Sequence, residues 1–224
     1  QGKITSFLGA YDLESRLAVT KEYLSKCDAV FTHCKYNQGL IENEYGVSSP
    51  YAVYRGIPSE YFKFDIQKKN FKSIDIAYVG ALYESKNVEK TLYVVLRLVN
   101  LGVPVSYKII GDGNQMDYLK DLVVKLGLAG IVQFYGWLES DSFRSILFLS
   151  NIFLFLSNKK AERLPNAVKE AMAAGCVPVV INLGAQPEIV DHNKNGFCWN
   201  NTDELIKYTK NLIKNKLKYS LLKN

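Results

Sequence analysis

The sequence lacks any apolar run long enough to cross a membrane, because the longest, residues 146–156, is interrupted by Ser150 and Asn151. Residues 1–6 also lack the basic start, apolar stretch and cleavage site of a secretory signal peptide. These two absences predict a cytoplasmic protein. Of the 224 residues, 48% are hydrophobic and 22% are charged, a balance that excludes an intrinsically disordered chain.

Cysteine and histidine are scarce, and they do not occur at the spacings that metal ligands show. No two cysteines form a C-x-x-C pair, and the histidines do not complete a ligand set with them. We therefore expect reduced thiols, no metal site, and histidines in ordinary surface or loop positions. The residues concerned are Cys27, Cys34, Cys176, Cys198, His33 and His192.

Positive charge is in excess, and the net charge of +6 indicates an anionic partner. Nucleic acid, a membrane surface and a phosphorylated small molecule all meet that condition. Six lysines lie between Lys207 and Lys223, so much of the excess is local to the C-terminus. A solvated helix face is the favoured explanation of this run, with peripheral docking on anionic lipid as the alternative.

Strand-like apolar runs alternate with helix-like segments along most of the chain. This alternation predicts an α/β protein with a doubly wound, Rossmann-like parallel sheet. Residues 59–73 are polar and aperiodic, which predicts a linker. The expected strands are 29–32, 51–54, 76–80, 105–110, 131–134, 152–156 and 177–181, and the expected helices are 35–45, 88–101, 114–126, 140–148, 166–174 and one from 203 onward.

Ligands of such sheets bind outside the carboxyl ends of the strands, so the loops after the strands form the candidate site. The loops concerned are 80–87, 111–115, 135–137, 157–166 and 182–188. Gly111 and Gly113 follow a strand and would let a ligand approach the backbone closely. Met116 stands where a dinucleotide fingerprint has its third glycine, which argues against a nicotinamide cofactor, and we expect no cofactor at all.

Two glutamates flank the start of the helix expected at 166–174. Pro165 suits a first helical turn, Glu162 then lies in the preceding loop, and Glu170 lies inside the helix. The free N–H groups near Asn166 and Ala167 favour a phosphate, and the carboxylates favour sugar or ribose hydroxyls. The alternative on spacing alone is that Glu162 caps the helix electrostatically and Glu170 faces solvent.

Six motifs in order resemble the C-terminal domain of the retaining family 4 (group 1) glycosyltransferases, whose two-domain architecture is the GT-B fold. The hallmark is a pair of glutamates separated by seven residues and followed by Ala-Met-Ala-x-Gly, which residues 162–175 match. The other motifs are residues 78–80 before Lys86, 109–113, 132–136, 176–180 and 187–190. The resemblance covers residues 75–199 and predicts the same fold for this chain.

The resemblance implies a role for individual residues. Glu162 would contact donor-sugar hydroxyls near the reacting carbon, Glu170 the ribose, and Lys86 the diphosphate leaving group. Such enzymes retain the anomeric configuration and need no divalent metal. The remaining donor-binding residues that it implies are Gly80, Gly111, Gly113, Tyr135, Arg163, Leu164, Asn166 and Ala167.

The chain departs from the family pattern at three places. Ala81 replaces an arginine that follows the first strand's glycine, and Arg163 replaces a glycine after the first glutamate. We hypothesise that Arg163 restores part of the lost charge. Leu8 stands where the family has a histidine that contacts the donor sugar.

The domain organisation that follows is a remnant of the N-terminal acceptor domain (1–58), a hinge (59–73), a nucleotide-sugar-binding domain (74–204) and a closing lysine-rich helix (205–224). The expected function is sugar transfer from a nucleoside diphosphate donor to an acceptor hydroxyl in polysaccharide or glycolipid biosynthesis. The expected partners are a nucleotide sugar and a sugar or lipid-linked acceptor, without nucleic acid. A non-catalytic donor-binding subunit, or a truncated and inactive transferase, is the alternative. A sugar-nucleotide epimerase of the same fold is disfavoured by the glutamate spacing.

Overall fold

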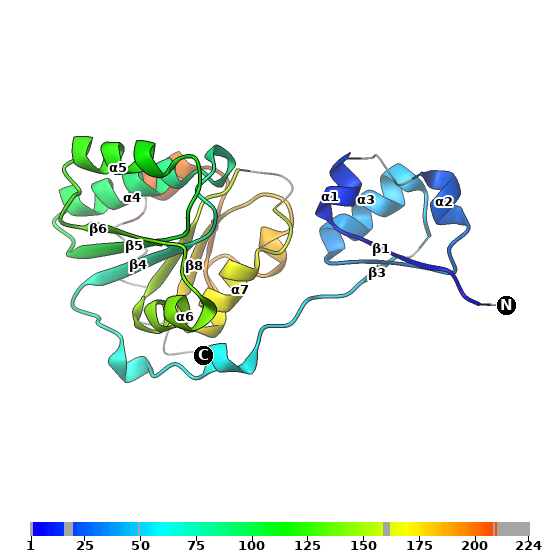
Figure 1. The fold of residues 1–224 in the computed structure, drawn as a ribbon, viewed down its shortest axis with the longest axis horizontal. Coiled ribbons are helices and arrows are strands. Elements are labelled where there is room, and N and C mark those ends of the chain that lie inside the picture. Colours follow the sequence, from blue (N-terminus) through cyan, green and yellow to red (C-terminus); the bar gives the residue numbers. More distant parts are fainter. Residues whose placement is uncertain (1, 16–19, 49, 159–161, 208, 210–224) are drawn as a thin grey trace.

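The computed structural model describes residues 2–15, 20–48, 50–158, 162–207 and 209. They form two parallel sheets, a small one near the N-terminus and a larger one that follows it (Figure 1). No helix within this part of the chain has both the length and the apolar character that a bilayer crossing requires.

The smaller sheet has the strand order β1-β2-β3, with all strands parallel. Its strands are β1 (Thr5–Leu8), β2 (Ala29–Thr32) and β3 (Tyr51–Ala52), and its helices are α1 (Ala10–Ser15), α2 (Lys21–Ser25) and α3 (Lys35–Tyr45). Helix α3 has its predicted bounds because Gly46 adopts the left-handed conformation (φ 67°) and stops it. Strand β1 and helices α1 and α2 were not predicted, because they are too short to show a clear period.

The larger sheet has the parallel order β6-β5-β4-β7-β8-β9, which confirms the predicted doubly wound topology. Its strands are β4 (Ile74–Val79), β5 (Val105–Ile110), β6 (Val132–Gly136), β7 (Ile152–Phe155), β8 (Val177–Ile181) and β9 (Phe197–Trp199). Its helices are α4 (Val88–Asn100), α5 (Met116–Lys125), α6 (Ser140–Leu149) and α7 (Asn166–Ala173). Helices α4 and α5 cover one face and α6 and α7 the other (Figure 1). The chain reverses its direction across the sheet between β4 and β7, and this switch point is where doubly wound sheets bind ligands.

The predicted elements of the larger sheet agree with the structure to within two residues at most ends. Strand β9 was missed, since its three residues follow a polar loop without a strand-like run. Residues 202–207 are helical, as expected for the closing helix, whereas most of the lysine-rich segment 205–224 lies outside the described residues.

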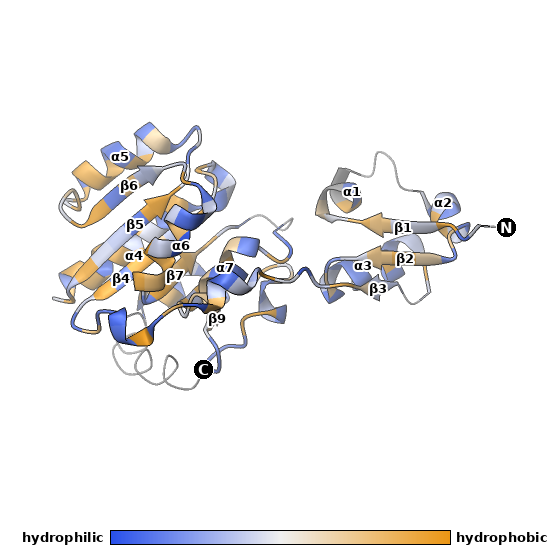
Figure 2. Cartoon of the chain, turned by 60° about the horizontal axis from the view of Figure 1, so that its bottom comes forward, coloured by the Kyte–Doolittle hydropathy of each residue, from blue (hydrophilic) through white to orange (hydrophobic). Residues whose placement is uncertain are grey.

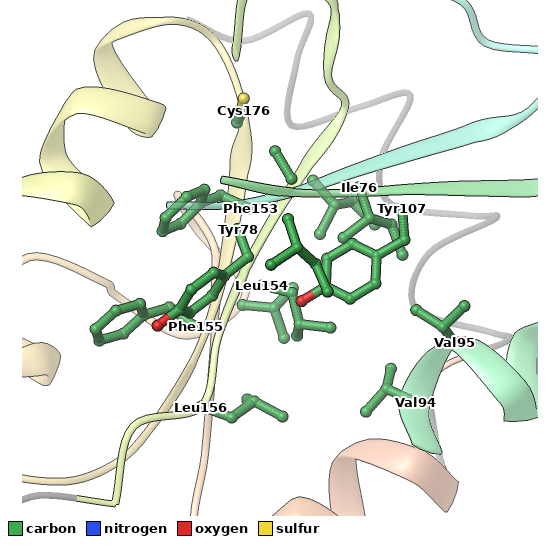
Figure 3. Close-up of a cluster of buried hydrophobic side chains, with 14 of the residues drawn as sticks. Ile76, Tyr78, Val94, Val95, Tyr107, Phe153, Leu154, Phe155, Leu156 and Cys176 are labelled. Carbon is green, nitrogen blue, oxygen red and sulfur yellow. The ribbon is translucent and has the colours of Figure 1, made fainter. Parts of the chain in front are cut away.

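The core of the larger sheet lies between β4, β5 and β7 and the helices, and every residue of β7 is buried. Figure 2 shows hydrophobic residues gathered along these strands. The rings of Tyr78 and Phe155 stack with centroids 6.0 Å apart in the cluster of Figure 3. The fully buried Tyr107 hydroxyl is satisfied by the Thr91 hydroxyl at 2.7 Å. All four cysteines are free thiols, and Cys176 is buried in this core.

Residues 59–73, predicted as a linker, pack against the larger domain instead of crossing solvent. They form two short 3-10 helices, η1 (Ser59–Phe62) and η2 (Ile66–Lys68). Tyr61 is only 3% exposed, and the buried Lys69 ammonium donates to the carbonyl oxygens of Leu147 (3.3 Å) and Ser150. In Figure 1 this segment, in cyan, runs along the lower side of the larger domain before it enters β4.

Candidate functional site

The loops that follow β4 and β7 are joined at the carboxyl edge of the larger sheet. Asn87 adopts a left-handed conformation (φ 56°), which is uncommon outside glycine, and its side-chain amide donates to the Leu156 carbonyl at 3.1 Å. The Ser157 hydroxyl donates to the Ser85 carbonyl at 3.0 Å. These hydrogen bonds hold Lys86, the last residue of the 3-10 helix η3 (Glu84–Lys86), over the end of β7.

Lys86 and Glu162 form an ion pair at this edge, with Nζ 2.5 Å from Oε1. The two side chains are 19% and 15% exposed, so the pair is shielded from water without being sealed from it. The Lys86 ammonium also lies 5.6 Å from the centre of the Phe155 ring. Two residues that sequence analysis selected separately are therefore in direct contact at the switch point.

Helix α7 begins beside this ion pair. Pro165 is its N-cap residue, with an extended backbone (φ −58°, ψ 122°), and Glu162 lies in the preceding loop, as expected. The N–H groups of Asn166 and Ala167 have no hydrogen-bond acceptor among the described residues. Unpaired donors and the helix dipole together make this end of α7 a favourable position for an anion.

A cavity of about 270 Å³ opens between the start of α7 and the smaller domain. Arg163 is 7% exposed, and its guanidinium carbon lies 4.9 Å from the centre of the Tyr36 ring of α3. A cation–aromatic contact of this kind joins the two domains at the cavity wall. The lining residues are Ala10, His33, Arg55, Glu162, Arg163, Leu164, Pro165, Asn166 and Lys169.

Four of these residues, Ala10, His33, Arg55 and Lys169, were not predicted as site residues from the sequence. His33, taken above as an ordinary surface or loop histidine, is half-buried and lines the cavity. Burial lowers its pKa, the charges of Lys169 and Arg55 lower it further, and Asp12 opposes them. The Lys169 ammonium donates to the Arg55 carbonyl at 2.9 Å. Only the meeting of two domains shows that these residues share a cavity, so no local pattern could have found them.

Glu188 holds the smaller domain against the larger one. Its carboxylate accepts the backbone N–H groups of Lys35 (2.9 Å) and Tyr36 (2.6 Å) at the start of α3, and the Tyr54 hydroxyl at 2.7 Å. A carboxylate at a helix N-terminus is favourable for both hydrogen bonding and the helix dipole. Burial and the hydrogen bond to the Glu188 carboxylate raise the pKa of Tyr54 to about 12.

Gly111 and Gly113 lie at the carboxyl edge, but the space that a side chain would take there belongs to the loop after β4. A Cβ atom on Gly111 would lie 1.8 Å from the Gly80 carbonyl oxygen, and one on Gly113 would lie 2.6 Å from the Leu82 carbonyl oxygen. Both glycines also adopt positive φ angles (137° and 159°). Close packing of backbone on backbone therefore requires glycine at both positions, and the ligand approach expected from the sequence stays a prediction.

Glu170 and Tyr135 do not line the cavity. Glu170 lies half-buried within α7, and burial raises the pKa of its carboxyl group while Lys169 and Arg55 lower it. It is thus not a fully solvent-facing side chain, the alternative left open above. The Tyr135 hydroxyl donates to the Gln133 side chain at 2.8 Å.

Solved structures share the architecture of most of this chain. The complex of Anabaena Alr3699/HepE with UDP and glucose matches 98% of this chain and 64% of that chain, with a TM-score of 0.74 and 17% identity. The lipopolysaccharide outer core galactosyltransferase WaaB in its apo form matches 90% of this chain and 59% of its own, with a TM-score of 0.74 and 19% identity. These matches show the fold, which is that of the GT-B glycosyltransferases, as predicted.

Sequence comparison gives the family. An uncharacterized glycosyltransferase of Methanocaldococcus jannaschii is 30% identical over 157 residues, which cover 64% of this chain and 39% of the relative. The putative colanic acid biosynthesis glycosyltransferase WcaL of Escherichia coli is 31% identical over 129 residues, 55% of this chain and 32% of the relative. The chain thus spans about a third to two fifths of these relatives' length. The family model described as "Glycosyl transferases group 1" matches residues 60–224. The chain therefore belongs to the group 1 glycosyltransferases.

Proposed function

We propose that this protein transfers a sugar from a nucleoside diphosphate donor to an acceptor hydroxyl, with Glu162 and Lys86 at the reacting centre. The observation that carries the proposal is their ion pair at the switch point, beside the start of α7, where the N–H groups of Asn166 and Ala167 have no acceptor among the described residues. A carboxylate suits sugar hydroxyls, and an ammonium beside a helix N-terminus suits a diphosphate.

The chemistry follows from the charge that develops during the reaction. As the bond between the anomeric carbon and the diphosphate breaks, negative charge grows on the leaving group. Lys86 and the start of α7 stabilise that charge, since both are positive and already in position. Glu162 accepts hydrogen bonds from sugar hydroxyls when Lys86 turns from the carboxylate to the diphosphate. We propose retention of the anomeric configuration and no requirement for a divalent metal.

Arg163 supplies the second cation for the diphosphate, which is missing at position 81 because an alanine stands there. Its guanidinium lines the cavity and lies on the Tyr36 ring, so its position depends on the contact between the domains. Removal of this charge should weaken binding of the donor, and equal donor affinity in Arg163→Ala and the parent protein would contradict the role.

Glu170 hydrogen-bonds the ribose in this proposal. Its half-buried position in α7 keeps it close to Lys169 and Arg55, whose charges favour the ionised carboxylate. The cavity of about 270 Å³ is smaller than the roughly 300–1,000 Å³ of sites for drug-sized ligands. It therefore holds only part of the donor, the sugar beside Glu162 and the diphosphate beside the start of α7, with the nucleoside extending toward the loops that contain Gly111 and Tyr135.

The acceptor belongs to polysaccharide or glycolipid biosynthesis in this proposal. Its support is the names of relatives, which include WcaL and the lipopolysaccharide core biosynthesis glycosyltransferase LpsE of Rhizobium meliloti, 32% identical over 110 residues. Docking of the lysine-rich segment 205–224 on anionic lipid remains part of the proposal.

Calorimetric titration with UDP, ADP and GDP tests the donor site. We expect one nucleotide to bind, Glu170→Ala to weaken it about tenfold or more, and Glu139→Gln, an exposed carboxylate, to leave it unchanged. No binding of any nucleotide would refute the donor site. Transfer assays with the matching nucleotide sugars follow, in which EDTA should leave the rate unchanged and NMR of the product should show a retained anomer.

A non-catalytic donor-binding subunit is the second candidate. The observation that favours it is the alanine at position 81 beside a Lys86 whose charge is already paired with Glu162. Donor binding without hydrolysis or transfer, under conditions in which a related transferase turns over, would select this candidate.

A further inference from the structure

His33 forms the wall of the cavity that faces α7 from the smaller domain. It follows β2 directly, and its ring packs edge-on against Phe7, with centroids 4.6 Å apart and planes at 70°. The same cavity is lined by Glu162 from the larger domain. Two polar side chains from opposite domains thus meet one space of about 270 Å³.

The ring nitrogens of His33 have no hydrogen-bond partner in the part of the chain that the structure describes. Gly9 leaves the room beside them: a Cβ there would lie 3.5 Å from His33 Nε2 and 3.3 Å from Asp12 Oδ2. The Asp12 carboxylate accepts the Gly9 N–H at 2.8 Å, which fixes this turn of the chain. An imidazole held by ring packing and left without a polar partner is available to a ligand.

Burial and the cations around the cavity favour the neutral form of this imidazole. Burial and the cations Lys169 and Arg55 lower the pKa of His33, whereas the Asp12 carboxylate raises it. A neutral imidazole has one donor and one acceptor nitrogen, the pair of functions that a sugar hydroxyl matches.

We propose that His33 contacts the sugar of the donor from the side opposite Glu162 and takes part in selecting which sugar is accepted. This assignment rests on the proposed function, because it requires the sugar to occupy the cavity between the two residues. The cavity is too small for a whole nucleotide sugar, and Glu162, the sugar-binding residue of that function, lines it together with His33, so we assign the His33 contact to the sugar.

The test compares a nucleotide with its sugar conjugate. UDP and UDP-glucose are the first probes, since both occur in solved structures of similar fold, and the ADP and GDP pairs follow. We expect His33→Ala to weaken UDP-glucose binding about 2- to 10-fold, the value of one neutral hydrogen bond, and to leave UDP binding unchanged. His33→Gln, which keeps a donor and an acceptor, should recover part of the loss.

His192→Gln is the matched control, because this second histidine packs on Trp199 and does not line the cavity. Unchanged UDP-glucose affinity in both His33 variants would overturn the assignment. An equal loss for UDP and UDP-glucose would also overturn it, since His33 would then act on the fold of the site. If His33→Ala does not fold by circular dichroism, His33→Gln decides between these outcomes. A parent protein that binds none of the nucleotides would refute the proposed function itself, and this assignment with it.

Discussion

The two sheets of this chain are built on the same parallel plan, and they differ in how completely they are covered. The larger sheet has helices on both faces and strands whose side chains are buried on both sides, as in β7 and β8. The described core of the smaller sheet consists of five buried side chains, which are Leu8, Leu13, Leu24, Val30 and Ile41.

The uncovered face of the smaller sheet has a row of aromatic rings. Phe7, Phe31 and Tyr51 are aligned across the three strands by the pairing register, and Phe7 and Tyr51 are 50% and 57% exposed. The rings of Phe31 and Tyr51 stack with centroids 5.4 Å apart. Parallel sheets are normally buried on both faces, so the exposed rings show that the smaller sheet is covered less completely than the larger one.

This difference in coverage indicates which residues of the candidate site are held more firmly in position. Lys86 and Glu162 stand on the domain with the larger core, where the hydrogen bonds of Asn87 and Ser157 tie the loop of Lys86 to the end of β7. His33 stands on the domain with the partial core, and its position depends on contacts such as Glu188 with α3. The Lys86–Glu162 pair therefore suits the reacting centre, and the cavity wall that contains His33 suits adjustment to the substrate.

The largest expected effect is a difference between the two domains in their ability to fold alone. Residues 59–224 should unfold cooperatively when expressed alone, whereas residues 1–58 should not fold, because chains of about 60 residues are marginal even with a complete core. Thermal melts by circular dichroism and amide NMR spectra measure both. A cooperative melt of residues 1–58 would remove the basis of the comparison.

Replacement of Lys69 tests whether the connecting segment belongs to the larger domain. Lys69→Ala removes the donor to the Leu147 and Ser150 carbonyls together with a buried aliphatic stem, so we expect a loss of about 2–4 kcal/mol. Urea denaturation measures the change. Lys72→Ala, at an exposed position of the same segment, should stay within about 0.5 kcal/mol of the parent, and similar losses in both variants would contradict the anchoring role.

Glu188→Gln tests the contact between the domains. Loss of the charge weakens the hydrogen bonds to the Lys35 and Tyr36 amides, by about 1–2 kcal/mol for charge-assisted bonds. Hydrogen exchange at these two amides should accelerate, and small-angle scattering should report a larger radius of gyration. Glu139→Gln is the exposed control, and unchanged exchange in Glu188→Gln would show that other contacts hold the domains together.

Glu170→Gln has the smallest expected effect on the free energy of unfolding, and it should stabilise the protein where the variants above destabilise it. Burial raises the folded pKa of Glu170 above the ordinary value of 4.5, so the ionised carboxylate destabilises the folded state at neutral pH. That penalty disappears as the pH falls through the folded pKa toward 4.5 and below. Glutamine should therefore stabilise the protein by about 0.5–1 kcal/mol at pH 7 and by nothing near pH 4.

Melting temperatures at the two pH values measure this difference. Glu60→Gln, an exposed carboxylate, should show no such dependence. A destabilised Glu170→Gln variant at pH 7 would mean that the carboxylate is held by a favourable charge interaction with Lys169 and Arg55, which would then outweigh burial.

The sequence by itself determined the larger sheet and the position of most of its edge residues. Strands β5 and β8 and helix α3 have their predicted bounds, since the period of burial is written locally into each segment and Gly46 ends the helix. The parallel order follows from strand and helix alternation, and this order alone brings the loops with Lys86 and Glu162 to one edge.

Only the tertiary structure decided which side chains meet there. The ion pair joins residues 76 positions apart, and Glu188 reaches amides more than 150 positions away. The place of His33 in the cavity depends on the contact between two domains. A sequence pattern predicts that one face of a segment is buried, but it does not say which other segment covers that face. The path of the loops and the docking of the two domains decide which segments and side chains meet. For this reason the residues of the candidate reacting centre were predictable and the wall opposite them was not.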